Sequence, residues 1–163
     1  VHTDYFQGLV GEIIGQQLNG KVARIIFARF AKLFPNKKIT PEYLLKIPDA
    51  KIRESGPSWS KVSFVKDLAK NVVDGTLNLK KLKNLNDKQV LIELTKVKGI
   101  GPWTAQMFLI FTLGKEDVFS KGDLGLRKAI TKLYGQQETE VITRKWRPYR
   151  THACRILWKS LDI

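Results

Sequence analysis

The residue with the clearest chemical potential in this sequence is Asp123, within the stretch Lys121-Gly122-Asp123-Leu124-Gly125. It directly precedes a predicted helix, where the helix dipole favours a negative charge. An aspartate at this position often caps the helix by accepting a backbone N–H, which contributes about 1 kcal/mol. An ionised carboxylate can also stabilise positive charge that develops during a reaction, so both roles stay open. Asp117 is the nearest alternative, but it follows Glu116 in a predicted solvated turn.

A second stretch, KVKGIGPWTA at residues 96–105, places two glycines before a proline and a tryptophan. Gly99 and Gly101 permit positive φ or close approach of another backbone. Free N–H groups at the start of the following helix, together with Lys96 and Lys98, favour an anion. Pro102 suits the first helical position, which needs no N–H. The stretch predicts a helix–hairpin–helix that holds a DNA phosphate without reading bases, although an ordinary glycine-capped connection has the same local pattern.

The net charge supports a polyanionic partner. The 163 residues contain 29 Lys and Arg against 15 Asp and Glu, a formal charge of +14. Such an excess in a folded domain favours nucleic acid, with an acidic membrane surface or an acidic protein as competing partners. Hydrophobic residues make up 43% of the chain, which indicates a globular protein.

Other features of the composition bear on location and metal chemistry. No apolar run approaches the ~20 residues that a membrane span needs, and the first 15 residues show no signal-peptide pattern. Cys154 is the single cysteine, so we expect a buried structural thiol, no disulfide and no zinc cluster. The chain is therefore expected to be intracellular and not to contact a membrane.

Three-and-four spacing of apolar residues predicts helices nearly throughout, with no alternating strand pattern. About eight helices are expected, with short connections and no linker. This indicates a single all-α domain over residues 1–163, built either as one compact body or as two helical lobes. The expected helices cover residues 6–18, 22–33, a start at 40–42, 58 or 60 to 72, 86 or 87 to 94, 102–113, 123–134 and about 148–161.

Four segments together resemble one protein family. These are IIGQQL at 13–18, the string from Leu94 to Ala105, DVFSKGDLGLRKAI at 117–130, and WRPYR at 146–150 followed by Leu157-Trp158. In this order they resemble the helix–hairpin–helix DNA glycosylases, particularly the alkylation-repair branch of 3-methyladenine DNA glycosylase II, the AlkA-like group. The resemblance covers most of the chain. It implies two helical lobes with a cleft between them.

The resemblance places the helix–hairpin–helix at about residues 87–113 and the catalytic segment at about 117–134. It implies that Asp123 is the catalytic aspartate, since the same Leu-Gly-x-Arg-Lys run follows it. Cleavage of an N-glycosidic bond gives the sugar oxocarbenium character, which a carboxylate stabilises while water attacks C1′. An alkylated purine is already cationic, so it needs neither a general acid nor a metal to leave.

Trp103 separates this chain from the lyase branch of the same superfamily, whose Schiff-base lysine stands at this position. The resemblance implies that Trp103 lines the base pocket, where its π-face would stack on an electron-poor alkylated base. Simple packing of Trp103 in the core is the alternative. The Ser120-Lys121 pair departs from the apolar or proline pair usual in the family, which leaves pocket polarity and substrate range open.

Reaching a base in duplex DNA requires flipping it out and filling the gap. The resemblance implies that Gln17 or Leu18 is the wedge, with Leu18 stacking in the gap or Gln17 bonding to the orphaned base. Leu18 also continues the apolar spacing of the first helix, so a core role stays open. Trp59 would extend the pocket or the wedge, or else cover the core.

The remaining expected contacts are to the DNA backbone. Lys98, Gly99, Gly101 and Thr104 of the hairpin and Lys61 are expected to bind it. Lys121 would contact a phosphate beside the flipped nucleotide, face solvent, or form a Schiff base.

The resemblance further implies a structural Na⁺ or K⁺ ligated by the backbone carbonyls of Thr95, Val97 and Ile100, with no cofactor required. The resulting hypothesis is a monomeric, monofunctional glycosylase that excises alkylated purines such as 3-methyladenine from double-stranded DNA and leaves an abasic site. It would work in the cytoplasm of a prokaryote or the nucleus of a eukaryote. A non-catalytic helix–hairpin–helix DNA-binding module and a lyase acting through Lys121 are the alternatives. Relatives often carry further N-terminal helices, so the chain is expected to be a short version or a fragment of such a protein.

Overall fold

The computed structural model describes residues 4–161, and every regular element in that range is a helix, which confirms the predicted all-α class. The elements are α1 (Tyr5–Gly15), α2 (Gly20–Ala31), a 3₁₀ turn η1 (Pro35–Lys37), α3 (Pro41–Lys46), α4 (Asp49–Glu54), α5 (Trp59–Val73), α6 (Leu79–Leu82), α7 (Asp87–Leu94), α8 (Pro102–Met107), a π-helix η2 (Phe108–Thr112), α9 (Leu124–Tyr134), α10 (Thr139–Arg144) and α11 (Arg150–Lys159).

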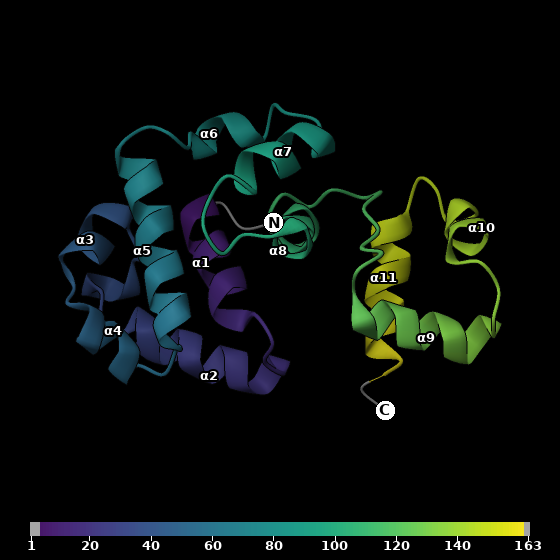
Figure 1. The fold of residues 1–163 in the computed structure, drawn as a ribbon, viewed down its shortest axis with the longest axis horizontal. Helices are drawn as coiled ribbons and strands as arrows, with labels where there is room; N and C mark the ends of the chain where they lie inside the picture. Colours follow the sequence, from purple (N-terminus) through teal and green to yellow (C-terminus); the bar gives the residue numbers. More distant parts are fainter. Residues whose placement is uncertain (1–3, 162–163) are drawn as a thin grey trace.

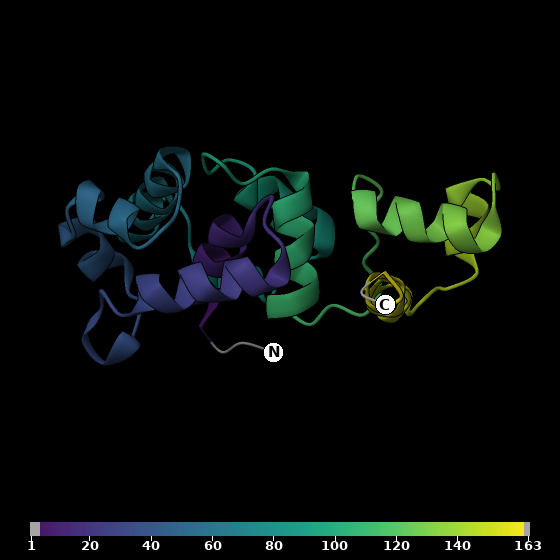
Figure 2. The same cartoon turned by 90° about the horizontal axis from the view of Figure 1, so that it is seen from below.

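The helices form two lobes of unequal size (Figure 1). The large lobe, residues 4–118, contains α1 to η2, and the small lobe, residues 119–161, contains α9 to α11. A view turned by 90° shows the same separation, with α11 seen end-on beneath α9 (Figure 2). Each lobe has its own cluster of buried apolar side chains, and Trp158 packs against both clusters.

Helix α1 lies at the centre of the large lobe, where neighbouring helices bury its predicted apolar stripe. It packs against α2, α5 and η2, and its buried residues are Phe6, Leu9, Val10, Ile13 and Ile14. The helix ends at Gly15 rather than at the predicted Leu18. Gln16 leaves the helical region with ψ 131°, and Gln17 takes a positive φ of 57°.

Helix starts follow the side-chain rules that predicted them. Asn86 forms a capping box with Gln89 at the start of α7, since each side chain bonds to the other residue's backbone N–H. Ser58 caps α5, and Asp123 caps α9. These caps satisfy N–H groups that the first helical turn leaves without partners.

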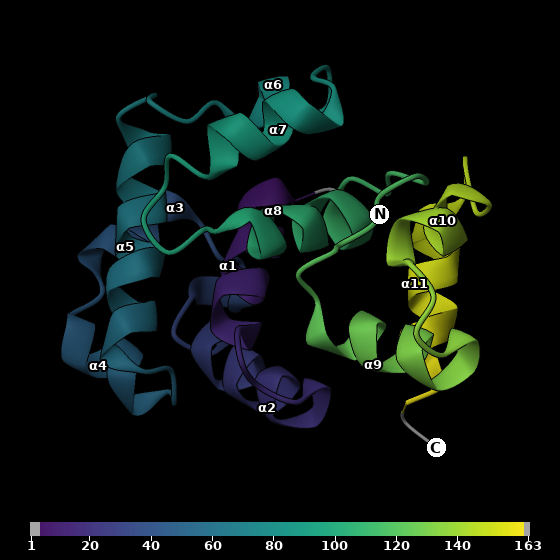
Figure 3. The ribbon, with the colours of Figure 1, turned by 45° about the vertical axis from the view of Figure 1, so that its right-hand side comes forward.

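The predicted helix over residues 102–113 divides into α8 and the π-helix η2. The N–H of Leu113 bonds to the carbonyl of Phe108 at 3.0 Å, a spacing of five residues instead of four. Helix α8 lies between α1 and the small lobe (Figure 3). This π-helix lies before the segment that leads to Asp123, and such turns are often found at functional sites.

The connection between the lobes is bonded to the start of α11. Asp117 accepts two hydrogen bonds from the Arg150 guanidinium, at 2.6 and 3.0 Å, and this contact holds the pKa of the Asp117 carboxyl below its usual value. The Thr151 hydroxyl donates to the carbonyl of Lys115 at 2.7 Å and accepts from the N–H of Val118 at 3.1 Å. Asp117 is thus a structural ion-pair partner.

Cys154 is fully buried in the small lobe, as predicted. Its thiol points to the carbonyl of Val118 at 3.7 Å, and burial raises the pKa of the thiol to about 11. A thiol in this state is unreactive near neutral pH.

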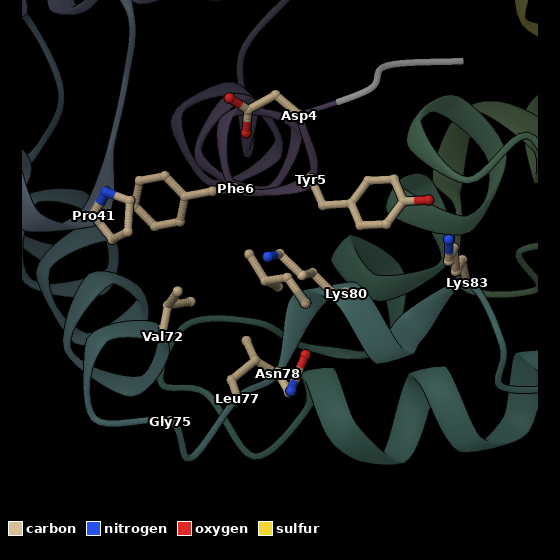
Figure 4. Close-up of a pocket in the computed structure, with 11 residues that line it drawn as sticks. Asp4, Tyr5, Phe6, Pro41, Val72, Gly75, Leu77, Asn78, Lys80 and Lys83 are labelled. Carbon is tan, nitrogen blue, oxygen red and sulfur yellow. The ribbon is translucent and has the colours of Figure 1, made fainter.

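A cavity of about 860 Å³ lies in the large lobe between the start of α1, the end of α5 and α6. Tyr5, Phe6 and Lys80 are among its lining residues (Figure 4). It shares no lining residue with the surroundings of Asp123 described below. Within residues 4–161, every helix is too short or too polar to cross a bilayer.

Candidate active site

Asp123 is held by donors from three helices. Its side chain is only 7% exposed although it lies at the edge of the small lobe. Oδ1 accepts from the backbone N–H of Leu126 at 2.8 Å and from Nε1 of Trp158 at 2.9 Å. Oδ2 accepts from Nε1 of Trp103 at 2.7 Å. Asp123 therefore caps α9, and two indole N–H groups fix the orientation of its carboxylate.

The two tryptophans reach Asp123 from different lobes. Trp103 lies in the first turn of α8 of the large lobe, and Trp158 lies near the end of α11 of the small lobe. The indole N–H of Trp103 donates to Asp123. The sequence had predicted either stacking of Trp103 on the base or its packing in the core, and neither alternative included this hydrogen bond. Trp158 had no predicted role, because its contact with Asp123 depends on how α9 and α11 pack. The Leu157-Trp158 pair in the C-terminal motif was the only sequence signal for it.

A pocket of about 530 Å³ opens beside Trp103 and the residues before Asp123. Phe119 and Gln106 form part of its wall, and its polar rim is strongly basic. The cationic residues that line it are Lys121, Arg144, Arg147 and Arg150. Such a rim suits an anion such as a phosphate.

The departure from the family pattern before Asp123 has a structural explanation. Ser120 is fully buried, and its hydroxyl donates to Oε1 of Gln106 on α8 at 2.7 Å. Ser120 therefore ties the segment before Asp123 to α8. Lys121 is exposed and pairs with Glu140 of α10 at the pocket rim.

The hairpin between α7 and α8 is shaped by Gly99. Its φ is +83°, and a Cβ at this position would lie 2.1 Å from Cγ of Phe64. The neighbouring N–H of Lys98 donates to Oδ2 of Asp67 at 3.0 Å. The large lobe itself therefore requires a glycine at position 99.

Gly101 differs from Gly99. It is exposed, its φ is an ordinary −87°, and no heavy atom lies within 4 Å of a Cβ built there. Nothing in the described structure requires a glycine at this position. Open space above a helix start is what an external backbone or phosphate would need.

The predicted wedge lies in the turn between α1 and α2, and this turn is attached to the hairpin. Nε2 of Gln16 donates to the carbonyl of Gly99 at 2.8 Å and to Oγ1 of Thr104 at 3.0 Å. Gln17 is exposed and Leu18 is half-buried, outside the helix. Gln16, which had no predicted role, therefore fixes the distance between wedge and hairpin.

Two predicted backbone-binding side chains have partners within the protein. Thr104 is 3% exposed and its hydroxyl accepts from Gln16, so only its main chain is left for a ligand. The ammonium of Lys61 donates to the carbonyls of Ile14 and Gln16 at 2.8 and 2.7 Å. Burial lowers the pKa of Lys61. The structure thus gives Lys61 a capping role at the end of α1, and its phosphate contact stays a prediction.

Trp59 is not brought to the pocket beside Trp103. It is the first residue of α5 and is 60% exposed, and it is absent from the lining of that pocket. It covers neither core to any large extent. Trp59 lies two residues before Lys61, whose ammonium donates to the carbonyl of Gln16 in the turn between α1 and α2.

The carbonyls predicted to hold a monovalent cation belong to the hairpin turn. The carbonyl of Val97 accepts the N–H of Ile100 at 3.1 Å, which leaves one lone pair free. Thr95 and Ile100 flank the same turn, and hard carbonyl oxygens suit an alkali cation. Among residues 4–161, no group of three or more His, Cys, Asp and Glu side chains could hold another metal.

The arrangement of hairpin, wedge turn and buried aspartate matches a known family. A family model described as HhH-GPD superfamily base excision DNA repair protein matches residues 10–149. The chain belongs to this superfamily. The match includes the hairpin and Asp123.

Individual members of the HhH-GPD superfamily are similar along most of the chain. A DNA-3-methyladenine glycosylase of Saccharomyces cerevisiae is 36% identical over 139 residues, which cover 79% of this chain and 46% of the yeast protein. The structure of the Schizosaccharomyces pombe 3-methyladenine DNA glycosylase in complex with abasic DNA has a TM-score of 0.88 and 30% identity, covering 99% of this chain and 82% of that one. The Bacillus halodurans DNA-3-methyladenine glycosidase has a TM-score of 0.82 and 37% identity, covering 98% and 76%.

The HhH-GPD relatives are often longer than this chain. It spans 56%, 73% and 46% of the length of three curated relatives, hence about half of two of them. The superfamily and the helical fold follow from these matches.

Proposed function

We propose that this chain is a monofunctional DNA glycosylase that hydrolyses the N-glycosidic bond of alkylated purines, such as 3-methyladenine, in duplex DNA. The observation that carries the proposal is the Asp123 carboxylate, which is oriented by indole N–H groups from both lobes. Preorganised charge of this kind stabilises a cationic transition state without a reorganisation cost. Relatives named as DNA-3-methyladenine glycosylases support the substrate class.

The chemical step uses Asp123 as the charged group. The C1′–N9 bond breaks, its electron pair leaves with the base, and positive charge develops on the sugar. The Asp123 carboxylate stabilises this charge and directs a water oxygen to C1′, and the proton of that water is released. A cationic methylated purine leaves as a neutral molecule, so this substrate needs no general acid.

DNA binding is assigned to the hairpin and to the basic rim of the pocket. The open space at Gly101 admits a phosphate to the N–H groups of the turn. Lys121, Arg144 and Arg147 at the pocket rim are close to the catalytic segment, where they can contact the next phosphates. A Na⁺ or K⁺ at the carbonyls of Thr95, Val97 and Ile100 would rigidify the turn and would supply no step of the reaction.

The turn that projects from α1 is assigned to base flipping. Gln17 is exposed, Leu18 is partly accessible, and the positive φ of Gln17 turns the chain outward from α1. The side chains of Gln17 and Leu18 would fill the gap that the extruded base leaves. We further propose that the protein acts as a monomer in the prokaryotic cytoplasm or the eukaryotic nucleus, where chromosomal DNA is found.

The decisive experiment compares the wild type with Asp123→Asn on methylated duplex DNA. The assay measures free 3-methyladenine and 7-methylguanine and the abasic sites that remain. We expect Asp123→Asn to slow release by roughly 10²–10³-fold at unchanged DNA affinity. Equal rates for the two proteins would exclude the role of Asp123.

The same samples test the two alternatives. A non-catalytic DNA-binding module would show salt-sensitive binding without abasic sites. A lyase acting through Lys121 would be trapped on DNA by borohydride, and the trapped complex would disappear in Lys121→Ala. Lys121 is exposed and pairs with Glu140, which favours neither the binding module nor the lyase over hydrolysis.

A further inference from the structure

The ammonium of Lys61 closes the end of α1 from outside that helix. Nζ donates to the carbonyl of Ile14 at 2.8 Å and to the carbonyl of Gln16 at 2.7 Å. The last carbonyls of a helix have no partner within the helix, and a cation is favoured beside them. Lys61 therefore fixes the point at which the chain leaves α1 and begins the turn that contains Gln17 and Leu18.

This turn has a backbone conformation that needs support from outside. Gln17 has a φ of 57°, in the left-handed region that residues with a side chain rarely adopt, and such a conformation persists only where neighbouring contacts hold it. The N–H of Leu18 donates back to the carbonyl of Gly15 at 3.1 Å. The Gln16 carbonyl that Lys61 binds belongs to the peptide that leads into Gln17. Lys61 thus holds the first peptide of the turn.

The side chain of Gln16 continues the connection to the hairpin. Its Nε2 donates to the carbonyl of Gly99 at 2.8 Å and to Oγ1 of Thr104 at 3.0 Å. Gln16 therefore accepts from Lys61 through its main chain and donates to the hairpin through its amide. Three hydrogen bonds in a row join α5, the turn after α1 and the hairpin.

Helix α5 also contacts the hairpin directly (Figure 3). A Cβ at Gly99 would lie 2.1 Å from Cγ of Phe64, and Oδ2 of Asp67 accepts the N–H of Lys98 at 3.0 Å. Lys61, Phe64 and Asp67 follow one another at three-residue spacing, so each is the surface neighbour of the next on α5. One helix therefore supports both the hairpin and the turn after α1, and fixes the distance between them.

We propose that Lys61 is a positioning residue for base flipping. It acts through Gln16 to hold the side chains of Gln17 and Leu18 at a fixed distance from the hairpin. The proposal rests on the proposed glycosylase function and deepens it: the hairpin fixes the protein on the DNA backbone, and Lys61 sets where the wedge meets the duplex. Lys61 touches neither the base nor the sugar, and its ammonium already donates twice within the protein.

Lys66 offers a matched comparison on the same helix. Its ammonium donates to the carbonyls of Leu45 and Ile47 at 3.1 and 2.6 Å, at the end of α3, and it pairs with Asp49 at 3.3 Å. Within residues 4–161, no hydrogen bond joins this end of α3 to the hairpin or to the turn after α1. Removal of either lysine therefore costs a similar helix cap, and only removal of Lys61 loosens the wedge.

The test compares Lys61→Met with Lys66→Met on duplex DNA that contains 7-methylguanine. Methionine keeps an unbranched apolar stem and has no N–H to donate. We expect Lys61→Met to slow single-turnover base release by roughly tenfold or more at saturating protein, while its affinity for undamaged duplex stays within about threefold of the wild type. Lys66→Met should keep the wild-type rate, and both variants should lower the urea midpoint of unfolding by similar amounts.

A fluorescence measurement separates flipping from the chemical step. A 2-aminopurine placed beside 7-methylguanine becomes brighter when its neighbour leaves the stack, and a background of Asp123→Asn keeps the base attached. The increase should be smaller with Lys61→Met than with Lys66→Met, and Lys61→Arg should restore it, since a guanidinium can donate to both carbonyls. Gln16→Ala keeps the cap of Lys61 and breaks the bonds to the hairpin, so it should lower the increase as well, even if Lys61→Met does not fold.

The outcomes distinguish this inference from the function on which it rests. A loss of affinity for undamaged DNA that accounts for the slower release by Lys61→Met would overturn the positioning role in favour of a phosphate contact. Equal rates for Lys61→Met and the wild type, or equal losses in Lys61→Met and Lys66→Met, would also overturn it and leave the proposed function in place. A wild type that releases no 7-methylguanine would overturn the proposed function itself.

Discussion

The two lobes are stabilised by different means. The large lobe buries 28 apolar residues in one cluster, whereas the cluster of the small lobe contains six. The small lobe compensates with polar contacts, chiefly the Asp117–Arg150 pair and the Thr151 hydroxyl, which fix α11 to the connection between the lobes. The hairpin thus rests on a large apolar core, while Asp123 belongs to a lobe that depends on hydrogen bonds and an ion pair.

The largest expected effect comes from breaking the support of the hairpin in the large lobe. Gly99→Ala forces a side chain into Phe64 at a backbone φ of +83°. We expect about 3 kcal/mol lower stability and roughly tenfold or more weaker DNA binding. Chemical denaturation and a fluorescence-anisotropy titration would measure the two quantities.

Gly101→Ala is the matched control for that change. Its Cβ enters open space at an ordinary φ, so stability should change by less than about 0.5 kcal/mol. DNA affinity should still fall if a phosphate approaches Gly101. Equal losses of stability in both variants would contradict the distinction between the two glycines.

The next largest effect tests the ion pair of the small lobe. Arg150→Met removes the nearer of the two arginine partners of Asp117 and leaves Arg147 at 3.7 Å, and we expect about 2 kcal/mol lower stability, since the Asp117 and Arg150 side chains are mostly buried. The wild type should lose this contribution as pH falls below about 4, because the contact lowers the folded-state pKa of Asp117 and protonation breaks the pair. Urea unfolding of both proteins between pH 3 and 7 would show it. Parallel pH curves would contradict this assignment.

A smaller effect tests the contact of the small lobe with the carboxylate. Trp158→Phe keeps an aromatic ring against Phe111 but removes the N–H that donates to Asp123. We expect roughly tenfold slower release of methylated bases with DNA affinity unchanged, because one of three orienting donors is lost. Single-turnover rates measure this effect, and a rate equal to that of the wild type would show that the donor is dispensable.

The smallest expected effect is a gain in stability from the large lobe. Because folding raises the pKa of Glu12 from 4.5 to about 7, its favourable protonated state is retained below pH 4.5 and lost as pH rises through 7. Because Glu12 is still partly exposed, solvent reduces this effect, and Glu12→Gln should be about 1 kcal/mol more stable than the wild type at pH 8 and equal to it at pH 4. Thermal melts at the two pH values would decide, and equal differences at both would contradict burial of the charge.

Local sequence rules predicted the elements whose signals are local. Asn86, Ser58 and Asp123 cap helices as expected, and Gly135 ends α9 with a φ of +67°. The short helices α4, α6 and α10 were missed because four to six residues do not show an apolar repeat. The end of α1 was placed too late because Leu18 continues the apolar spacing beyond the turn at Gln17.

The residues of the candidate site also divide into those with a local sequence signal and those without one. Asp123 and Trp103 were predicted from contiguous motifs. Trp158, Gln16 and the pairing of Ser120 with Gln106 were not, since each contact joins residues that only tertiary packing brings together. The burial that raises the pKa of Glu12 likewise depends on three packed helices rather than on neighbours in the sequence.

The three donors to Asp123 come from α8, α9 and α11, so the carboxylate takes its observed orientation only when all three helices have assembled. A chain that is still folding, or whose small lobe has opened locally, retains the aspartate without its alignment. Under the proposed function, base release is thereby confined to the completed protein. The donor-held carboxylate is therefore a property of the assembled tertiary structure and not of the sequence segment that contains Asp123.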